Sequence, residues 1–212
     1  MCSGRVDLAH VIRAFSKGAD GVFIGACDLN ECNYITHGNY HALTTVHIAK
    51  KLLERTGLNP ERLRIQFMSG AEASLFVESV NDFVKKVKEL GPLGEGEGLD
   101  EKGLKLKLEA VTGLIPYIRL VERERLRLPP MAEEAYQKFF DSDELKRIFD
   151  ETIIEKLAIG QIVSLLRKGP LTTGEIAQGV GLTPSEVSKH LSTSSRHRLV
   201  RYDESQKRYA LA

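Results

Sequence analysis

The sequence predicts a small α/β domain with a parallel sheet, followed by a helical linker and a winged helix-turn-helix domain. Helical and buried-strand patterns alternate over the first 92 residues, and parallel strands need crossover helices of this kind. Near the C-terminus, two capped short helices precede a hairpin pattern. We therefore divide the chain into residues 1–92, 93–131 and 132–212, with acidic helices leading the third part.

Composition is that of an ordinary globular protein. The chain has 212 residues, a formal net charge of +1, 42% hydrophobic and 28% charged residues, so no global field favours nucleic acid, a membrane or acidic substrates. We see no run of about 18 apolar residues and no signal peptide, and we expect no membrane association. Three cysteines without framework spacing argue for a reducing compartment, so the cytoplasm is the expected location.

Each element of the first domain has a local signal, such as the helix cap expected at Asp7. In chain order we predict a helix from Leu8 that stops at Gly18, a buried strand at Val22–Ala26, a polar loop at 28–39, a helix over about 40–55, a strand at Leu63–Met68 and a helix from Ser69 to Leu90. A two-stranded parallel sheet is too small to stand alone. We therefore expect that the N-terminal strands of this domain are missing, to be supplied by another chain or encoded upstream.

The middle of the chain changes composition twice. Residues 93–103 are a Gly/Glu-rich stretch that predicts a linker. The basic, leucine-rich segment Leu104–Leu128 predicts helix interrupted around Gly113 and Pro116. The acidic segment that follows, residues 133–155, predicts one or two exposed helices.

The last part has the element order of a winged helix. An apolar helix is predicted at Ile159–Leu166, and the capping boxes that begin at Thr172 and Thr183 start two short helices. A hairpin pattern then ends at Leu211.

The second capped helix has a polar outward face. Val187 and Leu191 are expected in the core. The residues expected to face outward or to meet phosphates are Ser185, Ser188, Lys189, Ser192, Arg196, Arg198, Arg201 and Arg208. Because positive charges are few, this face predicts modest affinity for DNA, and a protein-contact role remains the alternative.

The three cysteines are the strongest chemical signal. Cys27 stands where the first strand ends, Cys32 follows after a polar loop, and Cys2 lies in another turn. Ligands collect beyond the carboxyl ends of parallel strands, and loops can bring sulfur atoms together, so we interpret these thiols as a metal or cluster site. Buried free cysteines with no ligand are the alternative.

A cluster or structural zinc usually takes four ligands, and the cysteines supply three. His37 and His41 are the candidates for a fourth, although surface or capping roles are the more ordinary interpretation of both. Asp28 and Glu31 are expected to be solvated carboxylates of the loop.

Several short motifs together resemble a known family. They are Cys2-Ser-Gly-Arg-Val-Asp7, Gly18-Ala-Asp-Gly-Val22, Cys27-x4-Cys32-x-Tyr34, Gly38-Asn-Tyr40 and Pro60-Glu-Arg-Leu-Arg64. In this order and spacing they resemble the delta subunit of methyl-viologen-reducing hydrogenase over about residues 1–92. The resemblance implies a [2Fe-2S] cluster held by Cys2, Cys27 and Cys32, and electron transfer from a hydrogenase or formate dehydrogenase to heterodisulfide reductase.

The chain departs from that family in two ways. Family members usually begin about 40 residues earlier, with strands and a cysteine-rich motif that in some relatives contains selenocysteine. A UGA codon read as a stop would move the start to Met1, and reading the upstream DNA tests this hypothesis. Ala26, Asp28 and Asn33 also stand where the family tends to have glycine, histidine and histidine.

The C-terminal part is similar to the winged helices of ArsR-type regulators.

From the delta-subunit resemblance we expect a non-catalytic electron-transfer subunit of an oxidoreductase complex, with an iron–sulfur cluster, that passes electrons to a heterodisulfide-reductase-like flavoprotein. The alternative is a redox-responsive winged-helix regulator whose partner is DNA. A truncated product without a cluster is a third possibility.

Overall fold

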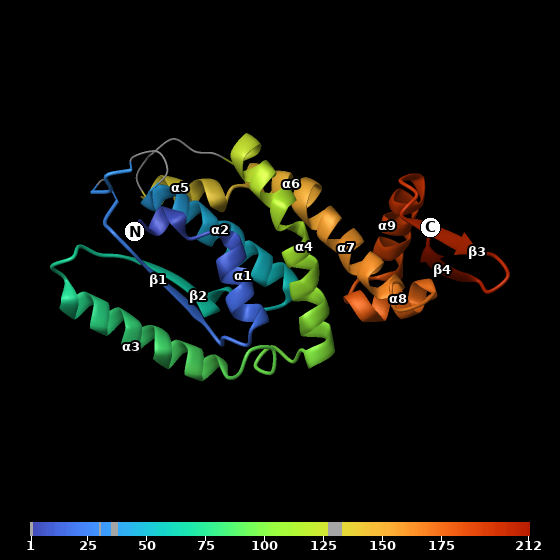
Figure 1. Ribbon diagram of the computed structural model, residues 1–212, viewed down its shortest axis with the longest axis horizontal. Helices are drawn as coiled ribbons and strands as arrows, with labels where there is room; N and C mark the ends of the chain where they lie inside the picture. The colour runs from blue at the N-terminus through green and yellow to red at the C-terminus, as the bar shows by residue number, and fades with distance from the viewer. Residues whose placement is uncertain (1, 30, 35–37, 127–132) are drawn as a thin grey trace.

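The computed structural model describes residues 2–29, 31–34, 38–126 and 133–212. The α/β part lies at one end of an elongated molecule and the winged helix at the other (Figure 1). The first part contains η1 (Ser3–Arg5), α1 (Leu8–Ser16), β1 (Val22–Ala26), α2 (Asn39–Thr56), η2 (Pro60–Arg62), β2 (Leu63–Phe67) and α3 (Ala73–Leu90). The rest of the chain, which includes the winged helix, contains α4 (Glu101–Arg125), α5 (Glu133–Phe140), α6 (Asp143–Phe149), the π-helical turn η3 (Asp150–Ile154), α7 (Glu155–Leu166), α8 (Thr173–Val180), α9 (Pro184–Arg196), β3 (Val200–Asp203) and β4 (Arg208–Leu211).

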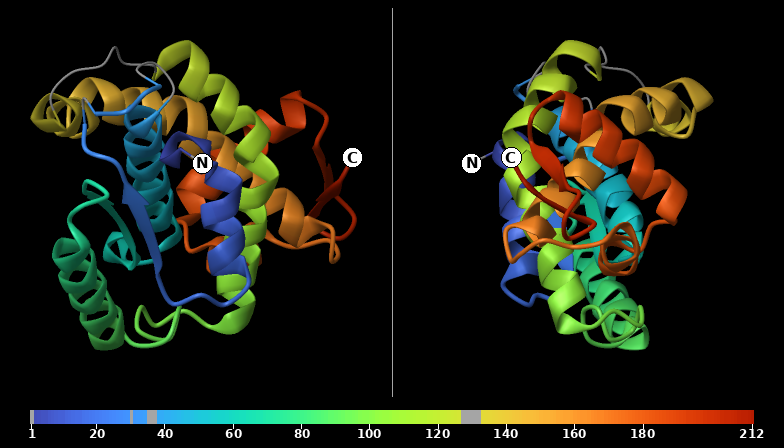
Figure 2. Two further views of the ribbon diagram at one scale, coloured as in Figure 1. Left: turned by 60° about the vertical axis from the view of Figure 1, so that its left-hand side comes forward. Right: turned by 90° about the vertical axis from the view of Figure 1, so that its right-hand side faces the viewer.

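The two N-terminal strands are parallel, as predicted. Their register runs from Val22 opposite Leu63 to Ala26 opposite Phe67. Side chains alternate along β1: Ile24 is buried in the core shared with α1 and α2, while Phe23 packs against the rings of α3. The sheet is therefore covered by α1 and α2 on one face and by α3 on the other (Figure 2).

Helix α4 differs from the prediction. The interruption expected around Gly113 and Pro116 is wrong, because α4 is one helix of 25 residues with Pro116 inside it. Proline removes one backbone donor from the helix, which costs stability but does not forbid the helix. Ile115 and Ile118 flank the proline and are 4% and 0% exposed, so tertiary packing of α4 holds the helix together.

The Gly/Glu-rich stretch predicted as a linker is fixed to the α/β part by an ion pair. Its Glu97 carboxylate pairs with the fully buried guanidinium of Arg62, with Oε1 2.6 Å from Nε and Oε2 3.0 Å from Nη2. The same carboxylate accepts the backbone N–H groups of Asn59 and Gly94. A turn-rich stretch is thereby anchored to the start of β2.

The acidic helices are amphipathic rather than simply exposed. Tyr136 and Phe140 of α5 and Leu145 and Phe149 of α6 are almost fully buried. These side chains belong to a hydrophobic cluster that extends from Leu8 to Leu157, so α5 and α6 pack with the α/β part. The predicted boundary at residue 131 lies outside the described residues, and the division into three parts stays a prediction.

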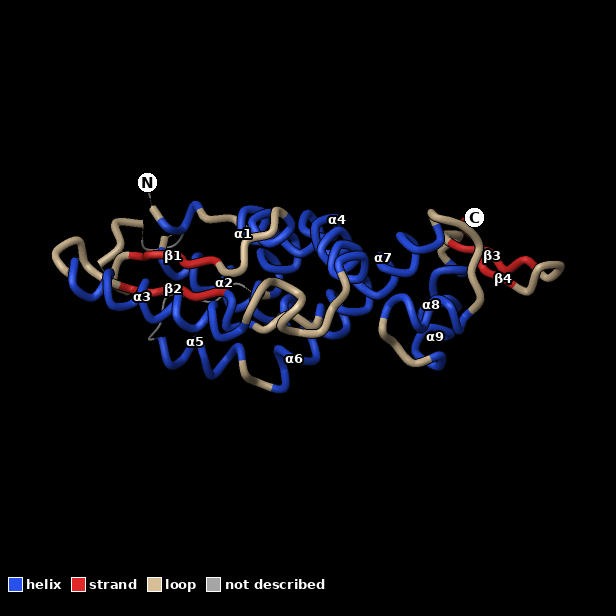
Figure 3. Tube along the Cα trace, turned by 90° about the horizontal axis from the view of Figure 1, so that it is seen from below, coloured by secondary structure: helices blue, strands red, loops and turns tan. Residues whose placement is uncertain are grey.

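The winged helix-turn-helix is present as predicted. Both capping boxes form, at Thr172 with Glu175 and at Thr183 with Glu186. Gly181 closes α8 in the left-handed conformation, with φ of 72°. The antiparallel hairpin β3–β4 lies at the far end of the molecule (Figure 3), and a separate core runs from Ile162 to Val200. Among the described residues, no helix is long and apolar enough to cross a bilayer.

Candidate metal centre

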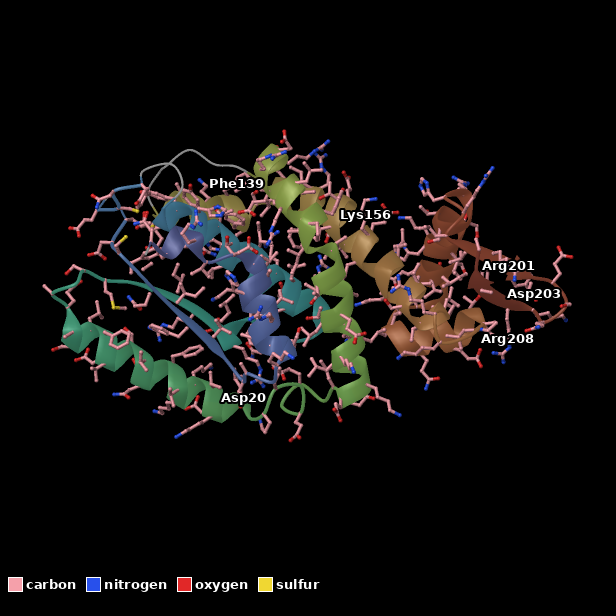
Figure 4. All side chains as sticks on the ribbon, in the orientation of Figure 1. Asp20, Phe139, Lys156, Arg201, Asp203 and Arg208 are labelled. Atoms are coloured by element: carbon pink, nitrogen blue, oxygen red, sulfur yellow. The ribbon has the colours of Figure 1, made fainter. Side chains whose placement is uncertain are left out.

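The three thiols lie in turns that meet near the carboxyl end of β1. Cys2 precedes η1 in an extended conformation, and its sulfur accepts the backbone N–H of Gly4 at 3.4 Å. Cys27 directly follows β1, and Cys32 lies in the loop between β1 and α2. Sulfur atoms, drawn yellow in Figure 4, lie at the end of the molecule opposite the winged helix. All three thiols are half-buried and free.

The sulfur atoms of Cys2 and Cys32 are 3.7 Å apart. Two thiolates bound at about 2.3 Å to one tetrahedral metal ion lie about 3.8 Å apart, so this separation suits two ligands of a single ion and also suits two free thiols in contact. Cys27 is close enough to both for their charges to act on its thiol. The structure thus brings two of the thiols into contact, and a site shared by all three stays a prediction.

The amide of Asn39 holds the turn that carries Cys27. Asn39 is the first residue of α2 and is completely buried. Its side-chain nitrogen donates to the carbonyl oxygens of Cys27 and Asp28 and lies 3.9 Å from the Cys27 sulfur. The Oδ1 atom of Asn39 is buried and has no hydrogen-bond partner among the described residues. The α2 N-terminus therefore positions one of the candidate ligands.

Gly38 makes room for another ligand. A Cβ atom at this position would lie 2.2 Å from the sulfur of Cys32 and 2.5 Å from the carbonyl oxygen of Tyr34. The close approach therefore requires a residue without a side chain. In the sequence, Gly38 and Asn39 stand out only as members of a motif, since contacts across a loop leave no periodic signal that would assign them a role.

The surroundings shift the thiol pKa values in opposite directions. Burial, and then the neighbouring thiols of Cys32 and Cys2, raise the pKa of Cys27. Burial also acts to raise the pKa of Cys32, but the backbone N–H groups of Tyr34 and Asn39, with the two other thiols, lower it overall. The Cys32 sulfur thus lies against the N-terminus of α2, where negative charge on it would be favoured.

Comparison with known proteins identifies the family of the part of the chain that carries the three thiols. Residues 1–91 match the family described as methyl-viologen-reducing hydrogenase, delta subunit. The vhu iron-sulfur subunit of the F420-non-reducing hydrogenase of Methanopyrus kandleri is 47% identical over 92 residues, which are 43% of this chain and 69% of that protein. The chain belongs to this delta-subunit family.

Two further relatives match the delta-subunit region of this chain. The corresponding iron-sulfur subunit of Methanococcus maripaludis is 44% identical over 91 residues, or 43% of this chain and 67% of that protein. One subunit of the ferredoxin/F(420)H(2)-dependent CoB-CoM heterodisulfide reductase of Methanosarcina acetivorans is 44% identical over 94 residues. These are 44% of this chain but only 12% of that much longer protein.

The ligand set of this delta-subunit chain is incomplete within the described residues. Its sulfur donors suit an iron–sulfur cluster, which takes four thiolates. No group of three or more His, Cys, Asp or Glu side chains in the described ranges forms a ready-made metal site. Of the fourth-ligand candidates, His37 lies outside those ranges, and His41 Nδ1 lies 3.4 Å from the Glu122 carboxylate of α4. The side chain of Glu31 is exposed, as predicted, and that of Asp28 is half-buried.

The C-terminal part of the delta-subunit chain matches a second family. Residues 161–202 match the bacterial regulatory protein, arsR family. Val187 and Leu191 of α9 are fully buried, as predicted. The outward-facing residues are exposed as well, namely Ser185, Ser188, Lys189, Ser192, Arg196 and Arg198.

Two predicted phosphate contacts have partners within the chain. Arg208 pairs with Glu175 at 3.1 Å and donates to the Pro170 carbonyl oxygen, while Arg201 donates to the Leu211 carbonyl oxygen. Both arginines lie on the wing (Figure 4). DNA contact by any of these residues stays a prediction.

Proposed function

We propose that this chain is the iron–sulfur electron-transfer subunit of an oxidoreductase complex. The observation that carries the proposal is the 3.7 Å separation of the Cys2 and Cys32 sulfur atoms, with Cys27 beside them. Cys2, Cys27 and Cys32 would hold a [2Fe-2S] cluster, and a fourth ligand would complete it. When bound, such a cluster supplies transfer of one electron at a time.

The protein's own residues set the conditions for that transfer. Asn39 fixes the turn after β1, and Gly38 allows Cys32 to lie against the start of α2. Backbone N–H groups directed at sulfur stabilise its negative charge and so tune the potential of a bound cluster. No side chain in this arrangement needs to act on a substrate bond.

The relatives support the choice of partners. Their names are those of hydrogenase iron-sulfur subunits and of heterodisulfide reductase subunits. Because this chain spans 12% of the matched heterodisulfide reductase protein and about two thirds of the hydrogenase ones, the partners are proposals. We propose that the donor is a hydrogenase or formate dehydrogenase and that the acceptor is a heterodisulfide-reductase-like flavoprotein.

Iron and acid-labile sulfide content, with an EPR spectrum of the reduced protein, tests the cluster. Anaerobic reconstitution should give about two irons per chain in the wild type and clearly fewer after Cys2→Ser, Cys27→Ser or Cys32→Ser. Glu31→Gln is the matched control, because it changes an exposed residue of the same loop. Equal iron content in the wild type and in a variant lacking all three thiols would contradict the proposal.

A second candidate function is that of a redox-responsive DNA-binding regulator. One observation favours it: the outward face of α9 is exposed, while the acidic residue at its start, Glu186, is engaged in the capping box with Thr183. Lys189 and Arg196 are therefore the charges that α9 presents most openly.

Gel retardation of DNA from upstream of the gene tests this second function. Replacing Lys189 and Arg196 with alanine should weaken binding at least several-fold and reduce its dependence on salt. Lys88→Ala, on α3, is the control that removes a positive charge from an exposed position elsewhere. Binding that is unaffected by both changes, or is absent in every cluster state, would exclude this function.

A further inference from the structure

Two of the three thiols are placed to react with each other. The sulfur atoms of Cys2 and Cys32 are in contact at 3.7 Å, and the residues are 30 positions apart in the chain. Neither residue is inside a helix or a strand, although the carbonyl oxygen of Cys2 accepts the backbone N–H of Arg5 at 3.0 Å at the start of η1. A disulfide bond of about 2.0 Å requires the two sulfur atoms to approach by less than 2 Å.

The third thiol, that of Cys27, lies in a backbone segment that is held by hydrogen bonds. Cys27 follows β1, whose pairing continues through the hydrogen bond from the Met68 N–H to the Ala26 carbonyl oxygen at 2.8 Å. Its own carbonyl oxygen accepts the amide of Asn39 at 2.9 Å. Movement of Cys27 therefore breaks hydrogen bonds that hold the end of the strand.

The backbone of Gly38, which lies against the Cys32 sulfur, also favours a bond between Cys32 and Cys2. The Gly38 backbone leaves no room for even a methyl group beside the Cys32 sulfur. The sulfur is thus blocked on the side of α2, and its contact with Cys2 remains available. Cys2 and Cys32 are therefore the pair whose sulfur atoms are in contact at 3.7 Å, and this contact favours a bond between them.

We propose that Cys2 and Cys32 form an intramolecular disulfide in the metal-free protein. The reaction is exchange with a small-molecule disulfide: one cysteine thiolate attacks it and releases one small thiol. The second cysteine then attacks the mixed disulfide and releases the other small thiol. The protein loses two electrons and two protons, and the small disulfide is reduced by the same amount.

This modification would make the site unavailable to metal until it is reduced. Metal ions bind thiolates, and the disulfide removes two of the three thiols in the chain. A dithiol reductant reverses the exchange and restores both ligands. The inference does not depend on which metal or cluster the reduced site takes.

Peptide mapping without reduction tests the proposal. Metal-free full-length protein, prepared anaerobically, is treated with oxidised glutathione, denatured and alkylated. Cleavage after Arg5 and Lys17 and before Asp28 places the three cysteines on separate peptides. The expected result is a cross-link between the Cys2 and Cys32 peptides, with Cys27 alkylated, and loss of that cross-link after treatment with dithiothreitol.

Variants separate this result from chance oxidation. Cys27→Ser should keep the cross-link, whereas Cys2→Ser and Cys32→Ser should abolish it and leave glutathione adducts. A dominant Cys27–Cys32 link in the wild type, or glutathione adducts without any intramolecular link, would overturn the proposal. Neither outcome bears on iron content, so failure here is distinguishable from failure of the proposed electron-transfer function.

Discussion

Asn39, the first residue of α2, donates its side-chain amide to the carbonyl oxygen of Cys27, the first residue after β1, at 2.9 Å. A second bond from the same nitrogen reaches the carbonyl oxygen of Asp28 at 2.7 Å. Two elements that are separated by the cysteine loop are therefore tied at the candidate metal centre. We therefore expect the loop to keep its shape only while this buried amide is present.

Asn39→Ala should destabilise the protein and weaken its metal site together. Two partly buried carbonyl oxygens would lose their donor, which costs about 2 to 3 kcal/mol of unfolding free energy. Urea denaturation at pH 7 and iron content after reconstitution are the measurements. Asn81→Ala, at an exposed position of α3, is the control and should change neither quantity. Unchanged stability of Asn39→Ala would show that the amide does not hold the loop.

Gly38→Ala should displace the sulfur of Cys32. The new methyl group would lie 2.2 Å from that sulfur, so the loop must shift, at a cost of about 1 to 3 kcal/mol. We expect iron uptake to fall several-fold. Gly25→Ala is the control within the same region, because a Cβ atom there would meet nothing within 4 Å. Full iron uptake by both variants would mean that the Cys32 position is not confined.

Local signals in the sequence predicted the elements well. The strand Val22–Ala26 and the capping boxes at Thr172 and Thr183 depend on residues that are close in sequence, and all three are confirmed. The three cysteines could be singled out because thiols that flank a polar loop are unusual. What the sequence could not predict is which residues support them: Asn39 reaches back 12 positions to Cys27.

Long-range packing overrode local signals at two places. Pro116 favours an interruption, yet the buried neighbours of α4 keep one helix through it. The composition of the Gly/Glu-rich stretch predicts only a linker, yet its Glu97 pairs with Arg62, which lies 35 positions earlier, and this ion pair fixes the stretch in place. In both cases the deciding partner belongs to another element, so no window of sequence contains the information.

Removing the Glu97 carboxylate should be strongly destabilising. Arg62 is 0% exposed and also donates to the carbonyl oxygens of Asp20, Leu90, Gly91 and Pro92. Glu97→Ala would leave this buried guanidinium without its counter-charge, which costs about 3 to 5 kcal/mol. Chemical denaturation measures the effect against Glu95→Ala, an exposed glutamate of the same stretch. Similar losses in the two variants would show that the ion pair contributes nothing specific.

Two half-buried groups, Glu122 and His47, give the protein opposing dependences of stability on pH. Burial, and then the Asp7 carboxylate, raise the pKa of Glu122 from 4.5 to about 7, although Arg119 acts in the other direction. The folded state therefore holds this proton more tightly, and its stabilising contribution is lost as pH rises from 4.5 to 7. Burial and the nearby Lys50 and Lys51 ammonium groups lower the pKa of His47 from 6.5 to about 4, against the Asp141 carboxylate. The contribution of His47 is lost as pH falls through that range.

Between pH 4.5 and 6.5 these two contributions should largely cancel in the wild type, so single substitutions should reveal each one. Glu122→Gln leaves His47 unopposed, and the unfolding free energy should then fall by about 1 kcal/mol for each unit that the pH decreases. His47→Phe keeps an aromatic ring stacked on Phe140, 4.4 Å away, and should reverse the slope, because the contribution of Glu122 is then no longer opposed by that of His47. Denaturation at half-unit intervals of pH measures both slopes. Parallel profiles for the wild type and the two variants would show that neither group is coupled to folding, because a proton bound equally in the folded and unfolded states cannot change stability with pH.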